Sequence, residues 1–250
     1  MVAFNELAIR HVTKTYMVDE TPLPVLQDIS LSVFPGEFVS IVGASGCGKS
    51  TLLRLIVGLD DSFRGEILLG GAPVNGPGAD RGIVFQDHRL FPWLTLTENV
   101  ALALDAFPLP VEEKTQRVHD AIALVGLTGF ERARPAQLSG GMAQRAAIAR
   151  ALVRRASILL LDEPRGALES LNRTRLQDAL LEIWEAQRTT VIMVTHDVEE
   201  AVYLSTRIVV MEPRPGRIRS VIIPVELNAR DRAAPDFVAL KQRVLADLRH

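Results

Sequence analysis

A glycine-rich stretch from Gly43 to Thr51, GASGCGKST, constrains the fold of this chain more than any other feature. The apolar run at 38–42 before it predicts a buried strand, and the apolar residues at 52–56 predict that a helix follows. Glycines allow successive backbone N–H groups to turn towards one anion, and the helix adds the positive end of its dipole. In this order of strand, loop and helix, the pattern G-x-x-x-x-G-K-[ST] predicts a site for a nucleoside triphosphate.

Every residue of the loop is a candidate phosphate ligand: Gly43, Ala44, Ser45, Gly46, Cys47, Gly48, Lys49, Ser50 and Thr51. We expect the Lys49 ammonium at the β- and γ-phosphates and the Ser50 hydroxyl at a Mg²⁺ ion. Cys47 is the only cysteine, which excludes an internal disulfide and favours a reducing compartment. Cys47 can be interpreted as a nucleophile or as a small residue that the loop tolerates, and we favour the second interpretation.

Composition limits the class of protein. The chain has 250 residues, of which 48% are hydrophobic, so one large domain can bury a full core. A formal net charge of −2 excludes a strongly basic nucleic-acid-binding surface but is compatible with a local basic patch. The N-terminus lacks the pattern of a signal peptide, and no apolar run approaches the roughly 20 residues of a membrane span. These features predict a soluble, cytoplasmic protein whose role at a membrane would require a partner.

Predicted strands and helices alternate along the chain, which indicates an α/β fold. We predict strands at 7–12, 29–33, 38–42, 66–69, 82–85, 158–161, 191–194 and 208–211. Helices are predicted at 111–125 and 142–152, around 176–184 and around 237–248. A polar turn is expected at Tyr16, and loops are expected at 21–24 and from Gly70 to Gly78. The stretch between 96 and 153 is mainly helical, so we expect a helical block inserted into the sheet core.

Polar side chains follow three of the predicted strands directly. Asp162 and Glu163 end the apolar strand at 158–161, where a carboxylate beside a phosphate loop can hold Mg²⁺. We assign Asp162 to the metal and Glu163 to the attacking water, as general base. Gln86 and His196 also follow strands, and we expect them near the metal or water and near the γ-phosphate, respectively.

These residues together resemble an ATP-binding cassette ATPase over nearly the whole chain. Residues 43–50 resemble its Walker A motif and 158–162 its Walker B motif, while Leu138-Ser139-Gly140-Gly141-Met142 resembles its signature. Gln86 is similar to the Q-loop glutamine, His196 to the switch histidine and Tyr16 to the aromatic residue that stacks on adenine. The run at 164–169 resembles the D-loop, except that Glu169 replaces the usual aspartate.

The resemblance implies a fold and a domain organisation. The expected fold is a P-loop NTPase sheet core with an antiparallel β subdomain and an inserted α-helical signature subdomain. The ATP-binding domain would span 5–228, with its helical subdomain at about 95–155. Residues 229–250 would form a C-terminal helix that packs on the core.

The segment Ser139-Gly140-Gly141 opens a predicted helix and is therefore a second candidate anion site. In the family, two subunits pack head to tail, and each signature closes over the ATP of its partner. The resemblance thus implies that Ser139, Gly140 and Gly141 contact nucleotide in an ATP-dependent homodimer.

The detailed motifs resemble the ATPase subunits of bacterial nitrate, aliphatic sulfonate and taurine importers. The segment from Gln86 to Trp93 resembles the groove that receives a membrane permease, and its Leu90, Phe91 and Trp93 are expected to be exposed. A periplasmic binding protein would act indirectly, and the chain would lie on the cytoplasmic side of the plasma membrane. Two alternatives are a soluble cassette ATPase that acts on nucleic acid or ribosomes and a P-loop kinase. We expect no nucleic-acid partner, because the chain has no basic arm or paired cassette.

Overall fold

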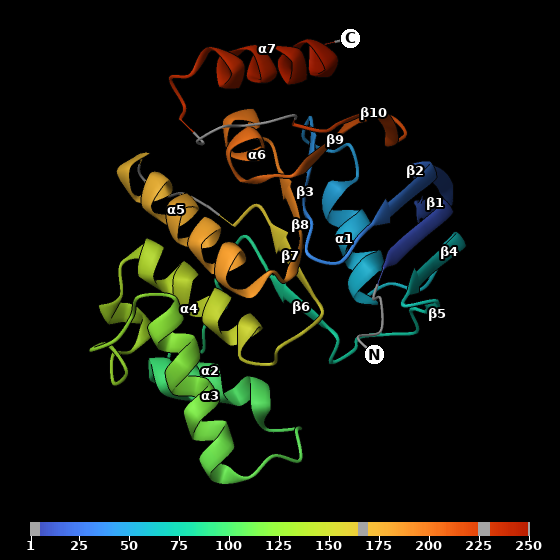
Figure 1. The fold of residues 1–250 in the computed structure, drawn as a ribbon. Helices are drawn as coiled ribbons and strands as arrows, with labels where there is room; N and C mark the ends of the chain where they lie inside the picture. The colour runs from blue at the N-terminus through green and yellow to red at the C-terminus, as the bar shows by residue number, and fades with distance from the viewer. Residues whose placement is uncertain (1–5, 165–169, 225–230, 250) are drawn as a thin grey trace. The chain divides into compact units, whose positions relative to one another are not determined.

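The computed structural model describes residues 6–164, 170–224 and 231–249. The chain divides into two compact units. Figure 1 colours the chain by residue number from blue at the N-terminus to red at the C-terminus. The first combines the residues up to 78 with those from 189 onwards, and the second consists of residues 79–188. Each unit carries a different set of the predicted site residues.

In the first unit the strands and helices follow in this order: β1 (Leu7–Val18), β2 (Thr21–Val33), β3 (Phe38–Gly43), α1 (Lys49–Val57), β4 (Arg64–Leu69), β5 (Ala72–Pro73), β8 (Thr190–Thr195), α6 (Val198–Leu204), β9 (Arg207–Glu212), β10 (Arg217–Ile222) and α7 (Pro235–Arg249). Strand β3 pairs in parallel with both β8 and β9, while β10 runs antiparallel to β9. All residues of β3 and β8 are buried, as their mainly apolar sequences predict for central strands of a parallel sheet.

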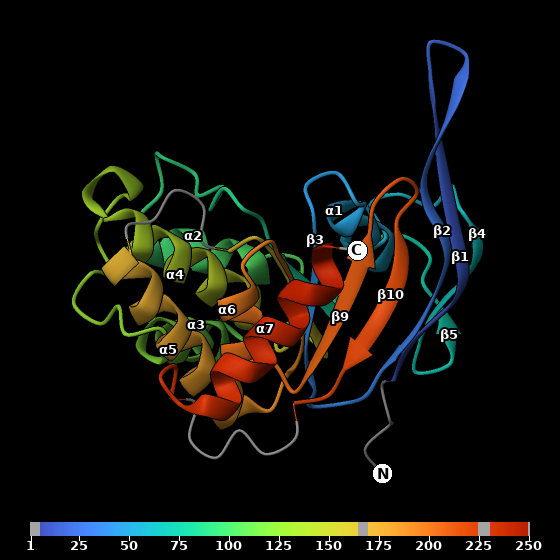
Figure 2. The same ribbon diagram turned by 90° about the horizontal axis from the view of Figure 1, so that it is seen from above.

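A separate antiparallel sheet joins β2, β1, β4 and β5 in this order. Tyr16 lies within β1 and residues 21–24 lie within β2, so the predicted turn and the predicted loop are wrong. These residues belong to the long β1–β2 hairpin, which extends beyond β4 in Figure 2. Most residues of its outer half are exposed, so neither face of the hairpin needs to be apolar there. Apolar and polar residues therefore do not alternate, and the sequence pattern does not indicate a strand.

Two shorter predictions were also incomplete. The segment from Gly70 to Gly78 includes the two-residue strand β5, which pairs with β4. No strand was predicted for β10, since its charged and apolar residues follow a turn rich in proline and glycine.

The C-terminal helix α7 forms as predicted and packs against α6 and β9 (Figures 1 and 2). Phe237 and Val244 are its buried residues, seven positions apart and therefore on one face of the helix. The Lys241 ammonium donates a hydrogen bond to Oε2 of Glu199 in α6 at 2.6 Å. The predicted domain boundary at 228 falls in a segment outside the described residues, so the domain division stays a prediction.

In the second unit the elements are β6 (Arg81–Val84), α2 (Leu96–Ala101), a 3₁₀ turn (Leu102–Leu104), α3 (Val111–Leu124), a second 3₁₀ turn (Pro135–Gln137), α4 (Gly140–Leu152), β7 (Ile158–Asp162) and α5 (Ser170–Gln187). Helix α4 contacts α2, α3, α5 and strand β6. Small alanine side chains make up most of its buried residues, and they allow this close packing on several sides. The helical character predicted for 96–153 is therefore confirmed.

Candidate functional site

The loop between β3 and α1 is open on one side. Gly46 and Gly48 have left-handed φ angles of 78° and 92°. A β-carbon on Gly48 would lie 2.6 Å from Cδ2 of Leu26, so only glycine fits there. A β-carbon on Gly46 would meet no atom within 4 Å, and residues 44–46 are exposed. The loop therefore leaves room for a ligand against its backbone.

Helix α1 begins at Lys49 without a side-chain cap, because the residue before it is Gly48. The first N–H groups of a helix lack partners within the helix and carry the positive end of its dipole. Lys49 is only 5% exposed, and its ammonium donates to the carbonyl oxygens of Gly43 and Ala44 at 2.8 and 3.0 Å. This uncapped helix start and buried ammonium fit a polyphosphate group.

Tyr16 lies in β1 at the centre of a polar cluster that the sequence did not predict. Its hydroxyl donates to Oδ2 of Asp60 at 3.0 Å, and the Lys14 ammonium donates to Oδ1 of the same carboxylate at 2.7 Å. The ammonium also lies 4.5 Å from the centre of the Tyr16 ring. One signal was available in the sequence, since Lys14 and Tyr16 are two positions apart in a strand and therefore share a face.

The cluster changes the acidity of two of its members. Burial and the hydrogen bond with Asp60 raise the pKa of the Tyr16 hydroxyl. Partial burial alone would raise the pKa of Asp60, but hydrogen bonds from Lys14, the Ser62 amide and Tyr16 outweigh it and lower that pKa below its ordinary value. Asp60 therefore stabilises the folded state above the ordinary pKa of aspartate, and this contribution is lost as the pH falls through the lowered pKa.

We expect Asp60→Asn to reduce the free energy of unfolding at neutral pH by about 1–2 kcal/mol, as for loss of charge-assisted hydrogen bonds. The deficit relative to wild type should shrink as the pH falls below the ordinary aspartate pKa of about 4. It should disappear once the pH has passed through the lowered pKa of the folded protein. Urea unfolding over a pH series measures both effects, and Asp61→Asn at the exposed neighbouring position is the control. A deficit that does not change with pH would contradict the assignment.

His196 lies at the same edge of the sheet as the glycine loop. It directly follows β8, whose Thr195 is paired with Val42 of β3. The buried Thr195 hydroxyl donates to Oε2 of Glu200 at 2.7 Å and accepts the N–H of Asp197 at 3.0 Å. These bonds fix the backbone on both sides of His196, whose own side chain is exposed. The first unit thus brings His196 and the loop to one edge.

The second unit gathers the other predicted catalytic and metal-binding residues. Strands β6 and β7 are parallel, with Val84 paired with Leu161. Gln86 therefore lies just beyond the carboxyl end of β6, while Asp162 ends β7 and Glu163 follows it. Gln86 is exposed, and both carboxylates are half-buried. Glu163 has a φ of 44°, and it is one of nine described non-glycine residues with a positive φ.

The predicted signature lies at the start of α4. Ser139 is the N-cap, and its Oγ accepts the N–H of Met142 at 3.3 Å. Gly140 and Gly141 begin the helix without left-handed φ angles, so the backbone itself does not require glycine there. Gly140 is exposed and Gly141 half-buried. Small residues at an accessible helix start leave space for a group that approaches the N–H groups.

Comparison with known proteins identifies the family. The family model described as ABC transporter matches residues 26–166, which is more than half of the chain. The chain belongs to the ABC transporter family. It is 47% identical to the aliphatic sulfonates import ATP-binding protein SsuB of Bacillus subtilis (strain 168), over 94% of this chain and 91% of the relative. An uncharacterised ABC transporter ATP-binding protein of Methanocaldococcus jannaschii is 46% identical over 96% of this chain and 90% of its own.

Solved structures of ABC cassettes share the fold. A dimeric post-hydrolysis state of the ATP-binding cassette MJ0796, bound to ADP and Pi, is 34% identical with a TM-score of 0.77. The similarity covers 88% of this chain and all of that chain. The cbiO1 protein from Clostridium perfringens, part of the ABC transporter complex cbiONQ, is 28% identical with the same TM-score, over 86% and 87% of the two chains. The chain is therefore a nucleotide-binding ATPase subunit of this family.

In this cassette the segment from Gln86 to Trp93 has two exposed aromatic side chains. Phe91 is 37% and Trp93 66% exposed, and their ring centres lie 5.4 Å apart. Leu90, which was expected to be exposed, is 7% exposed. That prediction is wrong because Leu90 packs inwards as part of the apolar core. The accessible apolar surface of the segment therefore comes from Phe91 and Trp93.

Two residues that the sequence analysis missed hold this segment in place. The Arg150 guanidinium in α4 donates to the carbonyl oxygens of His88 and Arg89 at 2.9 and 2.8 Å. Asn99 in α2 is fully buried, and its amide group binds both the N–H and the carbonyl oxygen of Phe91. Both contacts are to backbone atoms, so no side-chain pattern in the segment indicates them.

Residues 165–169 of the predicted D-loop, Glu169 among them, lie outside the described residues. In the described ranges 6–164, 170–224 and 231–249, no group of three His, Cys, Asp or Glu side chains is placed to hold a metal ion. None of the helices in this part of the chain has the length and apolar character that a membrane span requires.

Proposed function

We propose that this chain is the ATPase subunit of an importer for aliphatic sulfonates or a related small anion such as taurine or nitrate. The observation that carries the proposal is the 47% identity to an aliphatic sulfonates import ATP-binding protein over 94% of this chain. Permease subunits in the membrane and a periplasmic binding protein would select the transported anion. The chain itself would supply energy from ATP.

Residues 43–51 would hold the phosphates of ATP, and the Tyr16 ring would stack on the base. The uncapped start of α1 and the buried Lys49 ammonium support the phosphate part of this proposal. Ser50, Gln86 and Asp162 would hold Mg²⁺, which neutralises charge on the β- and γ-phosphates when bound. A hydroxyl, an amide oxygen and one carboxylate suit this ion, because Mg²⁺ takes its remaining ligands from phosphate and water.

Glu163 would orient a water molecule and accept its proton while the oxygen attacks the γ-phosphorus in line. The bond between the γ-phosphorus and the β–γ bridging oxygen breaks, which yields ADP and phosphate. His196 would donate a hydrogen bond to the γ-phosphate. The exposed position of His196 at the edge shared with the glycine loop supports this role.

The chain would act as a head-to-tail homodimer that closes on ATP. In it, the backbone at Ser139, Gly140 and Gly141 of one subunit would contact the phosphates bound by the other. The dimeric state of the similar MJ0796 cassette and the unstrained, accessible glycines at the start of α4 support this arrangement. The closed dimer would lie on the cytoplasmic face of the plasma membrane, bound to permease subunits through the segment from Gln86 to Trp93.

We expect Trp93→Ser to lower the permease-stimulated ATPase rate at least about tenfold, since exposed tryptophans often dominate protein interfaces. The rate of the isolated chain should remain unchanged, because the Trp93 side chain is 66% exposed and is not itself among the residues proposed to bind the nucleotide, Mg²⁺ or water. The test compares ATP hydrolysis with and without the co-expressed permease in membrane vesicles. Phe130→Ser, at an aromatic residue that is 43% exposed in the same unit, is the control.

Two outcomes would contradict the proposed function. If the permease stimulates the ATPase rate of Trp93→Ser as much as that of wild type, this segment is excluded as the docking site. If the chain sediments with ribosomes and its ATPase rate does not rise with the co-expressed permease, a soluble cassette ATPase would be favoured instead.

A further inference from the structure

We propose that Lys14 and Asp60 are positioning residues that hold the Tyr16 ring where it stacks on the nucleotide base. The inference rests on the proposed role of Tyr16 in ATP binding. It adds to that role a mechanism that determines the orientation of the ring.

Lys14 is an unusual lysine in this chain. The sequence has only four lysines among 28 basic residues, at positions 14, 49, 114 and 241. The structure describes all four, and only Lys14 and Lys49 are buried, at 2% and 5% exposed. Burial of a charged lysine is rare unless the charge is paired. Lys49 belongs to the phosphate loop, so the role of Lys14 requires a separate explanation.

The hydrogen bonds of Lys14 and Asp60 form a closed network around Tyr16. The Lys14 ammonium donates to Oδ1 of Asp60 at 2.7 Å and to the carbonyl oxygen of Ser62 at 2.5 Å, and it lies 4.5 Å from the Tyr16 ring centre. Asp60 accepts the Ser62 N–H at 3.0 Å through Oδ1 and the Tyr16 hydroxyl at 3.0 Å through Oδ2. The ring is thus held by its hydroxyl and by a cation over its face.

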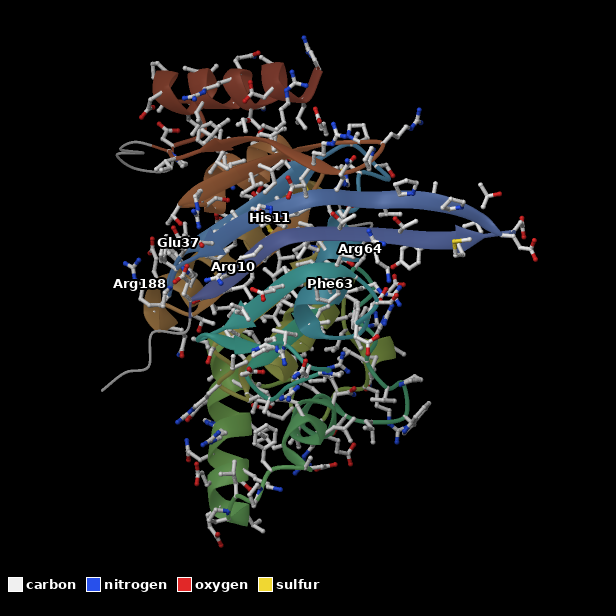
Figure 3. All side chains as sticks on the ribbon, turned by 90° about the vertical axis from the view of Figure 1, so that its right-hand side faces the viewer. Arg10, His11, Glu37, Phe63, Arg64 and Arg188 are labelled. Carbon is white, nitrogen blue, oxygen red and sulfur yellow. The ribbon has the colours of Figure 1, made fainter. Side chains whose placement is uncertain are left out.

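The same network links the ring to the phosphate-binding helix. Asp60 follows the end of α1, the helix that begins at Lys49. Beyond Asp60 the chain reaches Phe63 and Arg64, both labelled in Figure 3, and Arg64 pairs with Thr13 of β1. The segment that carries Asp60 is therefore held by α1 at one end and by the strand of Tyr16 at the other. This arrangement keeps the ring at a set place relative to the phosphate loop.

An ammonium suits this place better than a guanidinium. Lysine presents a compact charge with three donors, whereas arginine presents a planar fork. Here the charge must fit between a carboxylate, a carbonyl oxygen and an aromatic face. Loss of the charge would leave the half-buried Asp60 carboxylate without its cation, and the ring would lose the cation over its face.

The proposal predicts which part of the ligand each variant affects. Aromatic stacking accepts any base, so the effect should be the same for adenine and guanine nucleotides. Pyrophosphate has no base, so its affinity should depend on the phosphate loop alone. Isothermal titration of the full chain with ADP, GDP and inorganic pyrophosphate therefore separates the two parts of the site.

We expect Lys14→Met to weaken ADP and GDP binding about tenfold, the size expected when stacking on an aromatic ring is lost. Pyrophosphate affinity should stay within about twofold, as for independent sites. In a Tyr16→Ala background, Lys14→Met should have no further effect on ADP affinity. Asp60→Asn is a second variant that should show the same selective loss. The control is Arg10→Met, which lies in β1 like Lys14 and removes an exposed ion pair with Glu66 of β4.

The outcomes distinguish this inference from the proposed function. Unchanged ADP affinity in Lys14→Met and Asp60→Asn, or an equal loss for ADP and pyrophosphate, would overturn the inference. An additive loss in the Tyr16→Ala background would also overturn it. A wild-type chain that binds neither ADP nor pyrophosphate would instead refute the proposed ATP site.

Discussion

Glu163→Gln is expected to lower kcat for ATP hydrolysis by about 10²–10⁴-fold, the usual contribution of a general base. Glutamine has nearly the same size but cannot accept the proton of the attacking water. The side chain follows β7 in a backbone conformation with positive φ, which the substitution leaves unchanged. ADP affinity should therefore remain as in wild type, because the glycine loop at residues 43–51 is intact.

Phosphate release measures kcat for this variant, and light scattering measures its mass with ATP and Mg²⁺. We expect the variant to accumulate as an ATP-bound dimer, since hydrolysis would no longer reopen it. Glu185→Gln, at an exposed glutamate on α5, should match wild type in both measurements. A Glu163→Gln chain that hydrolyses ATP at the wild-type rate, or that stays monomeric with ATP and Mg²⁺, would contradict the assignment.

Gly140→Leu is expected to reduce ATP hydrolysis at least about 100-fold, because a side chain would block phosphate groups from the start of α4. The fold should tolerate the change, since Gly140 is exposed and has no left-handed φ. Leucine also favours a helix over glycine by up to about 1 kcal/mol. The variant should therefore be as stable as wild type and still bind ADP at its own glycine loop.

Phosphate release, ADP titration and thermal unfolding together test this prediction. Ala123→Leu introduces a leucine at an exposed position on α3 and is the matched control for added bulk. Near-normal hydrolysis by Gly140→Leu would show that the start of α4 does not approach the nucleotide. Loss of ADP binding together with hydrolysis would show that Gly140 serves the glycine loop of its own chain.

The sheet strands that sequence analysis located best are those with continuous apolar sequences. Strands β3, β7 and β8 are buried except at Asp162, so their interiors are apolar apart from Ser40 in β3. The β1–β2 hairpin was only half predicted, since its outer part is stabilised by strand pairing rather than by burial. Exposed strand residues leave no apolar pattern, and for this reason Tyr16 was placed in a turn.

The residues of the candidate site also divide into those that the sequence indicates and those that only the structure shows. The glycine loop and the residues after the strand ends could be proposed as site residues from the sequence, because each lies within a short local motif. The contacts that hold these motifs could not be, since they join residues far apart in the chain. Lys14 and Asp60 are 46 positions apart, and Arg150 reaches the carbonyl oxygen of Arg89 across 61 positions. Every residue has a backbone carbonyl group, so the sequence does not indicate which carbonyl oxygens Arg150 binds. These contacts could be assigned only from the structure.

Chemical crosslinking tests most directly whether ATP joins the glycine loop of one chain to the signature of another. Cys47, the only native cysteine, is first replaced by serine. One chain then carries Ser45→Cys, a second chain with a different tag carries Ser139→Cys, and both carry Glu163→Gln to prevent hydrolysis. With ATP, a short bismaleimide should link the two tagged chains into one species with the mass of two subunits. The absence of a link between the two tagged chains, or a link that forms equally well without ATP, would contradict the head-to-tail dimer.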